Sequence, residues 1–387
     1  MSDEQVVVSN ETKKDKKSFF KKFKFTAKSI IQIVFIAIFI FTVSAFPVMY
    51  ICGVSAGKNY EQKVLTKAPD LDVLINNYTG FSDQFEQHFN DYFPMRSDML
   101  ELYSLLEYKV FNTSLLPETT SIGHNGWLFY ESWGTRDAVS GEKMLSEKAL
   151  EKIYNGLMAK YNKLKELGKQ YVVYLAAEKQ MIYPEHDRLT NAKYTLIDQL
   201  MEYLESKNCP IPVIYSRDYL LSKKTSTNQL FFKYDTHWNL LGAHYGYEDV
   251  MTKVKELLPA KNINIVKDFE LTKTTASGDL ASTIFLSKYL TEETPIPVYK
   301  HTPAYVGVGP ITKVTSDVNS DLKVFIYGDS FAQAHYWGAS FVQSACETRI
   351  MHNSNTFQTL LDNLGDSDVV IEECVQRVPT TLGRAEF

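Results

Sequence analysis

The amino-acid sequence predicts an α/β fold with a mostly parallel sheet covered by helices on both faces, preceded by one transmembrane helix. Two observations carry this prediction. Between residues 146 and 372, short apolar runs alternate with longer amphipathic stretches, as in sheets whose parallel strands are joined by helices. Close to the N-terminus, a long apolar segment holds no charged residue. With 387 residues, the chain can bury one large core or two modest ones.

The N-terminal segment predicts a basic cytoplasmic tail over residues 1–28 and a transmembrane anchor over residues 29–57. The tail holds eight lysines and four acidic residues, whereas the anchor holds no charge. Its apolar run is long enough to cross a bilayer at about 1.5 Å per residue. The run also exceeds the h-region of about 7–15 residues in a cleaved signal peptide. Because lysines mark the cytoplasmic side, we expect the chain after residue 58 to lie outside the membrane.

The charge distribution argues against nucleic acid as the main partner. The whole chain has 41 basic and 46 acidic residues, which gives a formal net charge of −5. Without the basic tail, 33 basic and 42 acidic residues remain, a net charge of −9. An acidic body repels the phosphates of nucleic acid.

After the anchor we expect a polar stalk over residues 58–74 and one external domain over residues 75–387. Aromatic side chains spaced four apart predict an amphipathic helix over residues 81–92. Pro94 ends this helix, and residues 96–110 predict a second one. The aromatic stripe is better explained by packing than by a ligand site.

From residue 146 the pattern becomes regular. The predicted helices cover residues 146–167, 196–206, 238–258, 331–345 and 357–364, and the predicted strands cover residues 171–175, 212–215, 324–327, 349–352 and 368–372. Residues 260–320 are rich in Thr, Pro and Gly and break this order. They predict an irregular insertion of loops and short strands beside the site.

The strand predicted over residues 324–327 ends in a turn that presents a candidate nucleophile. Gly328 breaks the apolar run, because glycine adopts backbone angles closed to other residues. Ser330 then lies at the start of the helix predicted over residues 331–345. The free amides of a helix start can hold the negative charge that develops on an attacked carbonyl. The alternative is that Ser330 is an ordinary N-cap beside Asp329.

Asp235 and His237 are the candidate partners of Ser330. They are two residues apart at the start of the helix predicted over residues 238–258. A carboxylate that close can bind one imidazole nitrogen and leave the other free as a base. This gives a serine-hydrolase arrangement in which Ser330 attacks, His237 takes its proton and Asp235 orients His237. The alternative is that Asp235 caps the helix and His237 packs with Trp238 beneath it.

A metal site is the remaining interpretation of these residues. His237 and His244 are seven apart on one face of the predicted helix, with Asp235 nearby. This spacing matches no HExxH or comparable ligand motif, so we expect neither a metal nor a cofactor. The cysteines outside the anchor are odd in number and lack CxxC spacing, and Cys374 fits a packed thiol better than a disulfide with Cys346.

The two motifs together resemble a known family. Asp235-Thr-His-Trp followed later by Gly328-Asp-Ser-Phe is similar to the SGNH-hydrolase-like domain of the alginate O-acetyltransferases and the related DHHW proteins. Thr236 stands where the DHHW name has a second histidine. Other stretches fit the family in the same order: Phe85…Tyr92-Phe-Pro-Met-Arg96, Gly123…Gly126-Trp-Leu-Phe-Tyr130, Glu178-Lys-Gln-Met-Ile-Tyr-Pro-Glu185, Gly278-Asp-Leu-Ala281 and Asp368-Val-Val-Ile-Glu-Glu-Cys-Val-Gln-Arg377. The resemblance covers roughly residues 75–378.

The resemblance implies a flavodoxin-like, three-layer α/β/α sandwich in which the Asp–His pair precedes the serine. It also implies the triad roles for Ser330, His237 and Asp235, with the backbone N–H of Ser330 in the oxyanion hole. Three residues in matching motifs are expected to shape the site without taking part in the chemistry: Tyr234, Lys179 and Arg377. Family members that bind polymer through an added β-domain carry it after the catalytic domain, and this chain ends at Phe387 without one, so we do not expect tight polymer binding by this chain alone.

Three functions fit these features. The leading one is a membrane-anchored O-acetyltransferase that passes an acetyl group through acyl-Ser330 to hydroxyls of an extracytoplasmic polysaccharide. Because acetyl-CoA is cytosolic, the resemblance implies a multipass membrane acyltransferase as the donor. The second is a carbohydrate acetylesterase, in which water resolves the same acyl-enzyme. The third is a non-catalytic scaffold in an envelope-polymer assembly, with a vestigial triad.

Overall fold

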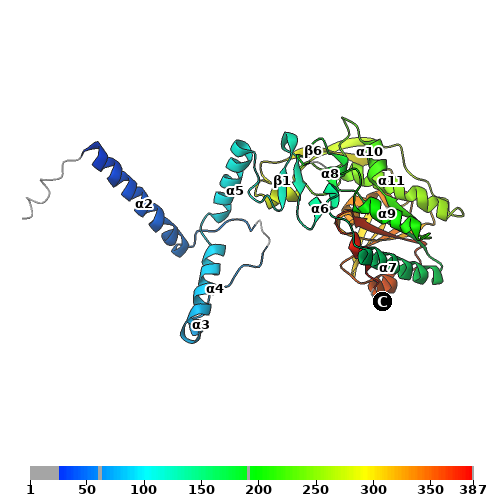
Figure 1. Cartoon of the computed structure of the whole chain (residues 1–387), viewed down its shortest axis with the longest axis horizontal. Coiled ribbons are helices and arrows are strands. Elements are labelled where there is room, and N and C mark those ends of the chain that lie inside the picture. Colours follow the sequence, from blue (N-terminus) through cyan, green and yellow to red (C-terminus); the bar gives the residue numbers. More distant parts are fainter. Residues whose placement is uncertain (1–25, 60–62, 190–191, 386–387) are drawn as a thin grey trace, which may run out of the picture. The chain divides into compact units, whose positions relative to one another are not determined.

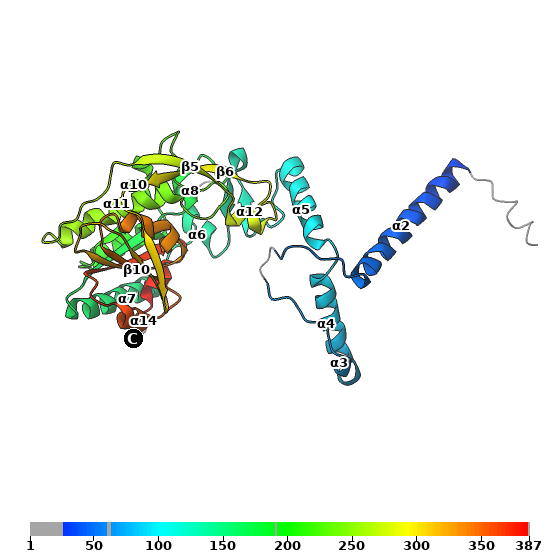
Figure 2. The ribbon, with the colours of Figure 1, turned by 180° about the vertical axis from the view of Figure 1, so that it is seen from behind.

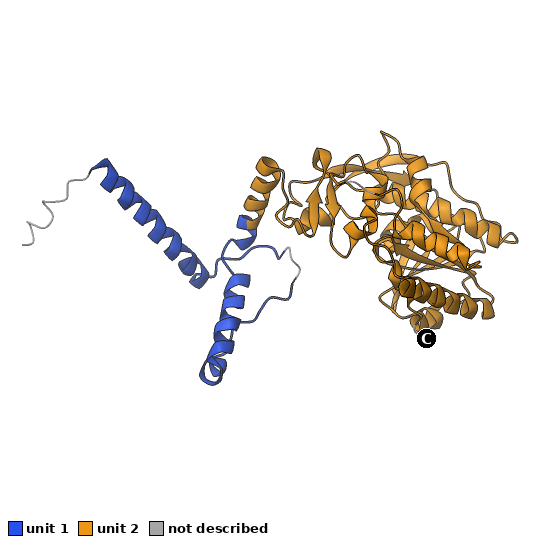
Figure 3. Cartoon of the chain, in the orientation of Figure 1, with its two compact units in different colours: residues 1–99 blue, residues 100–387 orange. Residues whose placement is uncertain are grey.

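The structure is a computed structural model that describes residues 26–59, 63–189 and 192–385. The chain divides into two compact units, residues 1–99 and residues 100–387 (Figure 3). The basic tail predicted over residues 1–28 lies almost wholly outside the described residues.

The first unit contains the one helix of the described residues that is long and apolar enough to cross a membrane. This is α2 (Ala27–Ile51), whose first turn is capped by Thr26. Helices α3 (Leu71–Asn76) and α4 (Tyr78–Asp91) follow. The predicted aromatic stripe of α4 is a row of stacked rings, with 6.2 Å between the ring centroids of Phe81 and Phe85. Stacking of this kind agrees with a packing role for the stripe.

The second unit is built on a seven-stranded sheet with the strand order β4-β3-β11-β9-β10-β8-β7 (Figure 1). Its strands are β3 (Gln170–Ala176), β4 (Val213–Tyr215), β7 (Ala304–Val308), β8 (Ile311–Thr315), β9 (Lys323–Gly328), β10 (Glu347–His352) and β11 (Val369–Val375). The first five in the spatial order are parallel, and β8 and β7 are antiparallel additions at one edge. The mostly parallel sheet predicted from the alternating pattern is therefore confirmed.

Helices cover both faces of this sheet, as Figure 2 shows from behind. The buried side chains of β3 alternate between the faces: Val172 and Tyr174 belong to one core cluster, and Tyr171 and Val173 belong to the other. On the first face lies α11 (Leu240–Leu257), and on the second lie α7 (Glu147–Glu166), α9 (Leu196–Ser206) and α14 (Phe357–Asn363). The predicted three-layer sandwich is confirmed.

The helix starts follow from local capping chemistry. Ser146 caps α7 through the amide of Ala149, and Thr195 forms a reciprocal capping box with Asp198 at the start of α9. Asn239 accepts two amides at the start of α11. Because Asn239 holds this position, Asp235 is not the cap of α11, and that interpretation of Asp235 is wrong.

The insertion over residues 260–320 is more regular than its composition suggested. The strands β5 (Glu270–Ala276) and β6 (Glu292–Val298) form a separate antiparallel hairpin, while β7 and β8 extend the main sheet. The remaining elements are short: α5 (Arg96–Leu106), η2 (Glu107–Phe111), β1 (Thr120–Ile122), η3 (His124–Gly126), β2 (Leu128–Tyr130), α6 (Thr135–Ser140), α8 (Lys179–Ile182), α10 (Arg217–Lys223), α12 (Asp279–Thr283), η4 (Ser330–Ala332), η5 (Ala334–Gly338), α13 (Ala339–Phe341) and η6 (Pro379–Gly383).

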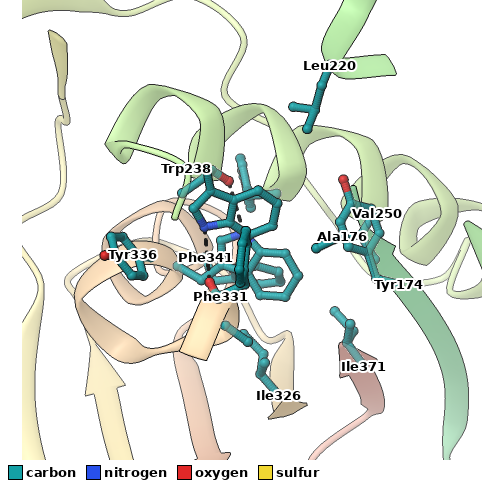
Figure 4. Close-up of a cluster of buried hydrophobic side chains, with 14 of the residues drawn as sticks. Tyr174, Ala176, Leu220, Trp238, Val250, Ile326, Phe331, Tyr336, Phe341 and Ile371 are labelled. Carbon is teal, nitrogen blue, oxygen red and sulfur yellow. Dashed lines mark hydrogen bonds between the residues drawn. The ribbon is translucent and has the colours of Figure 1, made fainter. Parts of the chain in front are cut away.

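The helix predicted over residues 331–345 is wrong. In its place η4, η5 and α13 follow one another as short turns, because Gln333 has extended backbone angles. The aromatic side chains of this segment are drawn into the core next to Trp238, as Figure 4 shows for Phe331 and Phe341. Burial of these large rings outweighs the helix propensity of the segment. Ser330 therefore lies at a short 3₁₀ turn, where a helix dipole contributes little.

Candidate active site

The turn after β9 holds Ser330 half-buried at the carboxyl edge of the sheet. Gly328 is required there by close approach, because a Cβ on it would lie 2.7 Å from Glu373 Oε2 and 2.7 Å from the Cβ of Ala332. The φ of Gly328 is not positive, so the backbone freedom expected from sequence is not the reason. Carboxyl edges of this kind are where open α/β sheets bind ligands.

Asp329 fixes the backbone on both sides of Ser330. One carboxylate oxygen accepts the amide of Phe331 at 3.0 Å, and the other accepts the amide of Val375 on β11 at 2.8 Å. The amide of Asp329 donates to Glu373 Oε2 at 3.1 Å. Burial and the adjacent Asp329 carboxylate raise the pKa of Glu373 well above its usual range, which favours its protonated form. The serine turn is thereby bonded to the central strand β11.

His237 and Asp235 form the predicted pair. Nδ1 of His237 lies 2.7 Å from Asp235 Oδ1, and the same oxygen accepts the His237 amide at 2.9 Å. A carboxylate only accepts, so Nδ1 carries the proton and Nε2 is left with its lone pair. Nε2 is buried and has no hydrogen-bond partner among the described residues. This is the arrangement of an imidazole available as a base.

Hydrogen bonding keeps Asp235 ionised. Burial alone would raise the pKa of Asp235, but the hydrogen bond from His237 lowers that pKa below its usual value. The second oxygen, Oδ2, accepts the amide of Asp279 at 2.8 Å. Both carboxylate oxygens are thus used to hold and orient the imidazole.

The Asp–His segment and the serine turn meet through aromatic side chains. The ring of His237 lies 4.9 Å from that of Phe331 and stacks at 5.3 Å on that of Tyr336. Nε1 of Trp238 donates to the carbonyl oxygen of Phe331 at 3.1 Å, which Figure 4 marks with a dashed line. The structure therefore brings the residues next to His237 and next to Ser330 together. It forms no Ser330–Nε2 hydrogen bond, since Nε2 has no partner among the described residues.

Lys179 holds the backbone of the Asp–His segment by hydrogen bonds. Its Nζ donates to three carbonyl oxygens of that segment, those of Phe232 at 3.1 Å, Lys233 at 3.4 Å and Asp235 at 2.6 Å. Burial lowers the pKa of Lys179 to about 8. The lysine is 1% exposed, so it acts on the backbone and not on a ligand.

Arg377 lies under the serine turn, paired with the buried Glu178 at 2.7 and 2.8 Å. Its guanidinium group lies 5.7 Å from the ring centroid of Phe331. Tyr234, the third residue expected to shape the site, is buried and contributes its carbonyl oxygen to the amide of Ala281. Each of the three therefore lies beside the pair or the turn.

Asp279 is a site residue that motif reasoning missed. It lies at the start of α12, in the insertion, and accepts the amide of Thr236 at 2.7 Å. Its Oδ2 is 3.8 Å from Nδ1 of His237. The Gly-Asp pair at residues 278 and 279 was the available signal in the sequence. Gly278 is needed there, because a Cβ on it would lie 2.1 Å from the Tyr234 carbonyl oxygen.

His237 and His244, which a metal site would join, have different hydrogen-bond partners. His244 uses Nδ1 on the Tyr299 hydroxyl at 2.9 Å and Nε2 on the Val266 carbonyl at 3.1 Å. Asp235, His237 and Asp279 do have ligand atoms within 4.8 Å of one another. Their hydrogen bonds to each other account for that closeness. Cys374 is a buried free thiol, as predicted.

A small pocket of about 270 Å³ opens beside the serine turn. It lies at the carboxyl ends of β9 and β10 and is lined by Asp329, Gln333, His335 and His352 among others. His335 is exposed, so it can face a bound molecule.

Residues 121–360 match the family described as "SGNH hydrolase-like domain, acetyltransferase AlgX". Among curated proteins, the chain is 24% identical over 220 residues to the probable alginate O-acetylase AlgJ of Pseudomonas aeruginosa, covering 55% of this chain and 52% of that protein. It is 23% identical over 218 residues to AlgJ of Azotobacter vinelandii, covering 55% and 53%. The chain thus spans about half the length of the curated relatives it matches.

Among solved structures, the chain resembles Bacillus cereus PatB1 with a sulfonyl adduct, with a TM-score of 0.50 and 14% sequence identity. The match covers 69% of this chain and 97% of that one. At this identity the likeness concerns the fold alone.

Proposed function

Because the chain belongs to the SGNH-hydrolase-like acetyltransferase family described for AlgX, we propose that it is an O-acetyltransferase acting on a cell-surface or exopolysaccharide. The family resemblance drawn from the two motifs is confirmed by this match. The AlgJ relatives, named as probable alginate O-acetylases, support the reaction class.

The observation that carries the proposal is the state of the His237 imidazole. Its Nδ1 is held by Asp235 at 2.7 Å, and its Nε2 is buried without a partner among the described residues, next to the turn that holds Ser330. An unpaired buried nitrogen costs stability, so its retention favours a functional role over a packing role. A Ser330–Nε2 hydrogen bond would form when an acyl donor seats the hydroxyl, since such bonds tighten on substrate binding.

In the proposed reaction, Oγ of Ser330 attacks the carbonyl carbon of an acetyl donor while its proton moves to Nε2 of His237. Nε2 returns that proton to the leaving group, and the Ser330 acetyl ester remains. A sugar hydroxyl then gives its proton to Nε2 and attacks the ester, and the proton returns to Oγ of Ser330. Asp235 stabilises the imidazolium at each stage. We assign the oxyanion to the backbone N–H of Ser330, which donates to no described residue.

The proposal includes a location at a membrane. With α2 spanning the bilayer and the tail inside, the second unit lies on the extracytoplasmic face, separated from cytosolic acetyl-CoA. A multipass membrane acyltransferase is the donor partner that this topology requires. The anchor would keep the site near that donor, which raises the effective donor concentration.

The test is a time course of the intact mass of the full-length chain in detergent with an activated acetate ester. The expected result is one acetyl adduct in the unmodified chain and none in Ser330→Ala. Addition of polysaccharide acceptors then separates the two resolutions of the acyl-enzyme. Acetyl transfer to the polymer supports the proposal, whereas release of free acetate alone, even with abundant polymer, would establish an esterase. Absence of any adduct, when the membrane donor is also supplied, would favour a scaffold.

A further inference from the structure

The second unit has a larger pocket that is lined by neither His237 nor Ser330 and that the proposed chemistry does not use. This pocket, here named the Trp127 pocket, has a volume of about 600 Å³. Its walls are the β5–β6 hairpin, the residues after α8 and the loop after α10, which Figures 1 and 2 place together. The volume is within the range of about 300–1,000 Å³ that is usual for ligand sites.

The Trp127 pocket combines aromatic side chains with a polar rim. The buried rings of Trp127 and Tyr183 line it and stack with 4.6 Å between their centroids. Hydroxyl and amide side chains form another part of the lining, among them Ser226, Asn228 and Thr272. A sugar ring has apolar C–H faces and a rim of hydroxyls that donate and accept, so this lining matches both parts of a sugar.

The charges in the pocket are compensated. Its two lysines are each paired with one of its two glutamates, Lys224 with Glu185 at 2.6 Å and Lys273 with Glu293 at 3.2 Å. Burial lowers the pKa of His186, which disfavours a positive charge on this histidine. A site for a uronate polymer needs an excess of cations to replace the hydration of each carboxylate, and this pocket has none. The body of the chain, with its net charge of −9, would repel a polyanion as well.

The Trp127 pocket is connected to the Asp–His segment by hydrogen bonds. Gln229, in the pocket wall, donates to Glu292 Oε2 at 2.7 Å, and Glu292 Oε1 accepts the amides of Lys233 at 2.7 Å and Tyr234 at 3.2 Å. Those two residues directly precede Asp235. On the other side, Lys179 lies 5.8 Å from the ring centroid of Trp127 and binds the Asp235 carbonyl oxygen. A chain seated in the pocket would therefore be linked through Gln229 and Glu292 to the segment that carries His237.

We propose that the Trp127 pocket binds a segment of the acceptor glycan, and that this glycan is neutral, in contrast to the polyuronate named for the AlgJ relatives. The inference rests on the proposed function for its role in acetyl transfer. The binding site and the substrate class are both tested by measuring glycan binding, which does not require acylation of Ser330.

The experiment measures binding of the full-length chain in detergent to an immobilised library of length-matched neutral and uronate oligosaccharides. The background is Ser330→Ala, so that binding is read without transfer. We expect binding to neutral members only, and a loss of at least about tenfold in affinity in Ser226→Trp, which fills the pocket from its exposed rim. Asn155→Trp, an equally exposed polar site on α7 across the sheet, is the matched control and should bind as the parent does.

A charge variant tests the substrate class. Glu293→Lys leaves the pocket with three lysines against one glutamate, so uronate oligosaccharides should begin to bind at low salt and be released at high salt. Three results would overturn the inference: uronates bound by the parent, no effect of Ser226→Trp, or no binding to any neutral member. Each is separable from failure of the proposed function, which would appear as an unacylated Ser330 with glycan binding intact.

Discussion

Trp238 and Phe331 are joined by a hydrogen bond of 3.1 Å between the indole Nε1 and the backbone carbonyl oxygen. Trp238 directly follows His237, and Phe331 directly follows Ser330. The two residues are 93 positions apart in the chain, and both are fully buried. This contact sets the distance between the candidate base and the candidate nucleophile.

Trp238→Phe should impair acylation more than it impairs folding. The change keeps most of the ring and removes the donor to the Phe331 carbonyl, so we expect a loss of about 1–2 kcal/mol in the free energy of unfolding. We also expect acylation of Ser330 to slow by about tenfold or more, because small displacements of reacting groups are costly. The matched control is Trp337→Phe, which removes the 3.0 Å bond from that indole to the Ala243 carbonyl. Equal slowing in both variants would refute the positioning role of Trp238.

Asp235→Asn should abolish most of the acylation while the fold persists. An amide can donate to Nδ1 and so favour the wrong tautomer, and losses of about 10⁴-fold are known for this change in serine proteases. Asp279→Asn is the control, because its remaining carbonyl oxygen can still accept the Thr236 amide. We expect the acylation rate of Asp279→Asn to fall by less than about tenfold. The rate constants of the burst phase with an activated acetate ester report acylation in both variants, and a mild effect of Asp235→Asn would remove Asp235 from the triad.

Lys179 should make stability rise with pH above about 8. Its pKa is lowered to about 8 in the folded chain, compared with 10.5 when unfolded. Between these values the unfolded chain binds more protons than the folded chain, so the free energy of unfolding increases with pH. Over that interval the increase should amount to about 3 kcal/mol. Denaturant titrations at several pH values compare the chain with Lys179→Met, which should lack this slope. If the free energy of unfolding depended on pH in the same way in both proteins, the lowered pKa of the buried Lys179 would be contradicted.

Replacement of Glu372 and of Glu373, which are adjacent on β11, by glutamine should have different effects on the free energy of unfolding. Glu373 has a raised pKa, so its ionisation is disfavoured in the folded chain and stability falls as the pH rises above the unfolded value of 4.5. Glu373→Gln should therefore unfold no earlier than the parent at pH 7 and still acylate. Glu372 pairs with the fully buried Lys160 at 2.5 Å. Glu372→Gln leaves the buried ammonium of Lys160 without its carboxylate and should lower the free energy of unfolding by about 3 kcal/mol. Thermal melts of both variants compare the two positions directly, and strong destabilisation by Glu373→Gln would show that Glu373 is ionised.

Gly328→Ala should displace the serine turn. The added methyl group would meet Glu373 Oε2 and Ala332 Cβ at 2.7 Å, in a fully packed region. Overpacking of this kind costs about 1–3 kcal/mol, and we expect acylation of Ser330 to be lost. Gly307→Ala on the edge strand β7 is the control, since its Cβ would meet nothing within 4 Å. Retained acylation in Gly328→Ala would show that the turn tolerates a shift.

The sequence determined the parts of this protein that depend on local pattern. Strands and helices from residue 146 onward follow the alternation of apolar runs and amphipathic stretches, because each pattern buries one face against a neighbour. The predicted bounds of α9 match the structure, since a capping box begins that helix. The two motifs, together with the other matching stretches in the same order along the chain, also indicated the family. The exception was the segment after Ser330, where four buried aromatic rings replace a regular helix with short turns.

Only the tertiary structure decided what surrounds those residues. Asp279 comes from the insertion and Lys179 from the start of α8, and each contacts the Asp–His segment although it lies far from it along the chain. No local pattern encodes such contacts, because their free energy is gained only when distant elements pack together. The same holds for the charge balance of the Trp127 pocket, in which each lysine meets its glutamate through the fold. Local sequence sets which elements form, while packing sets which polar groups face one another.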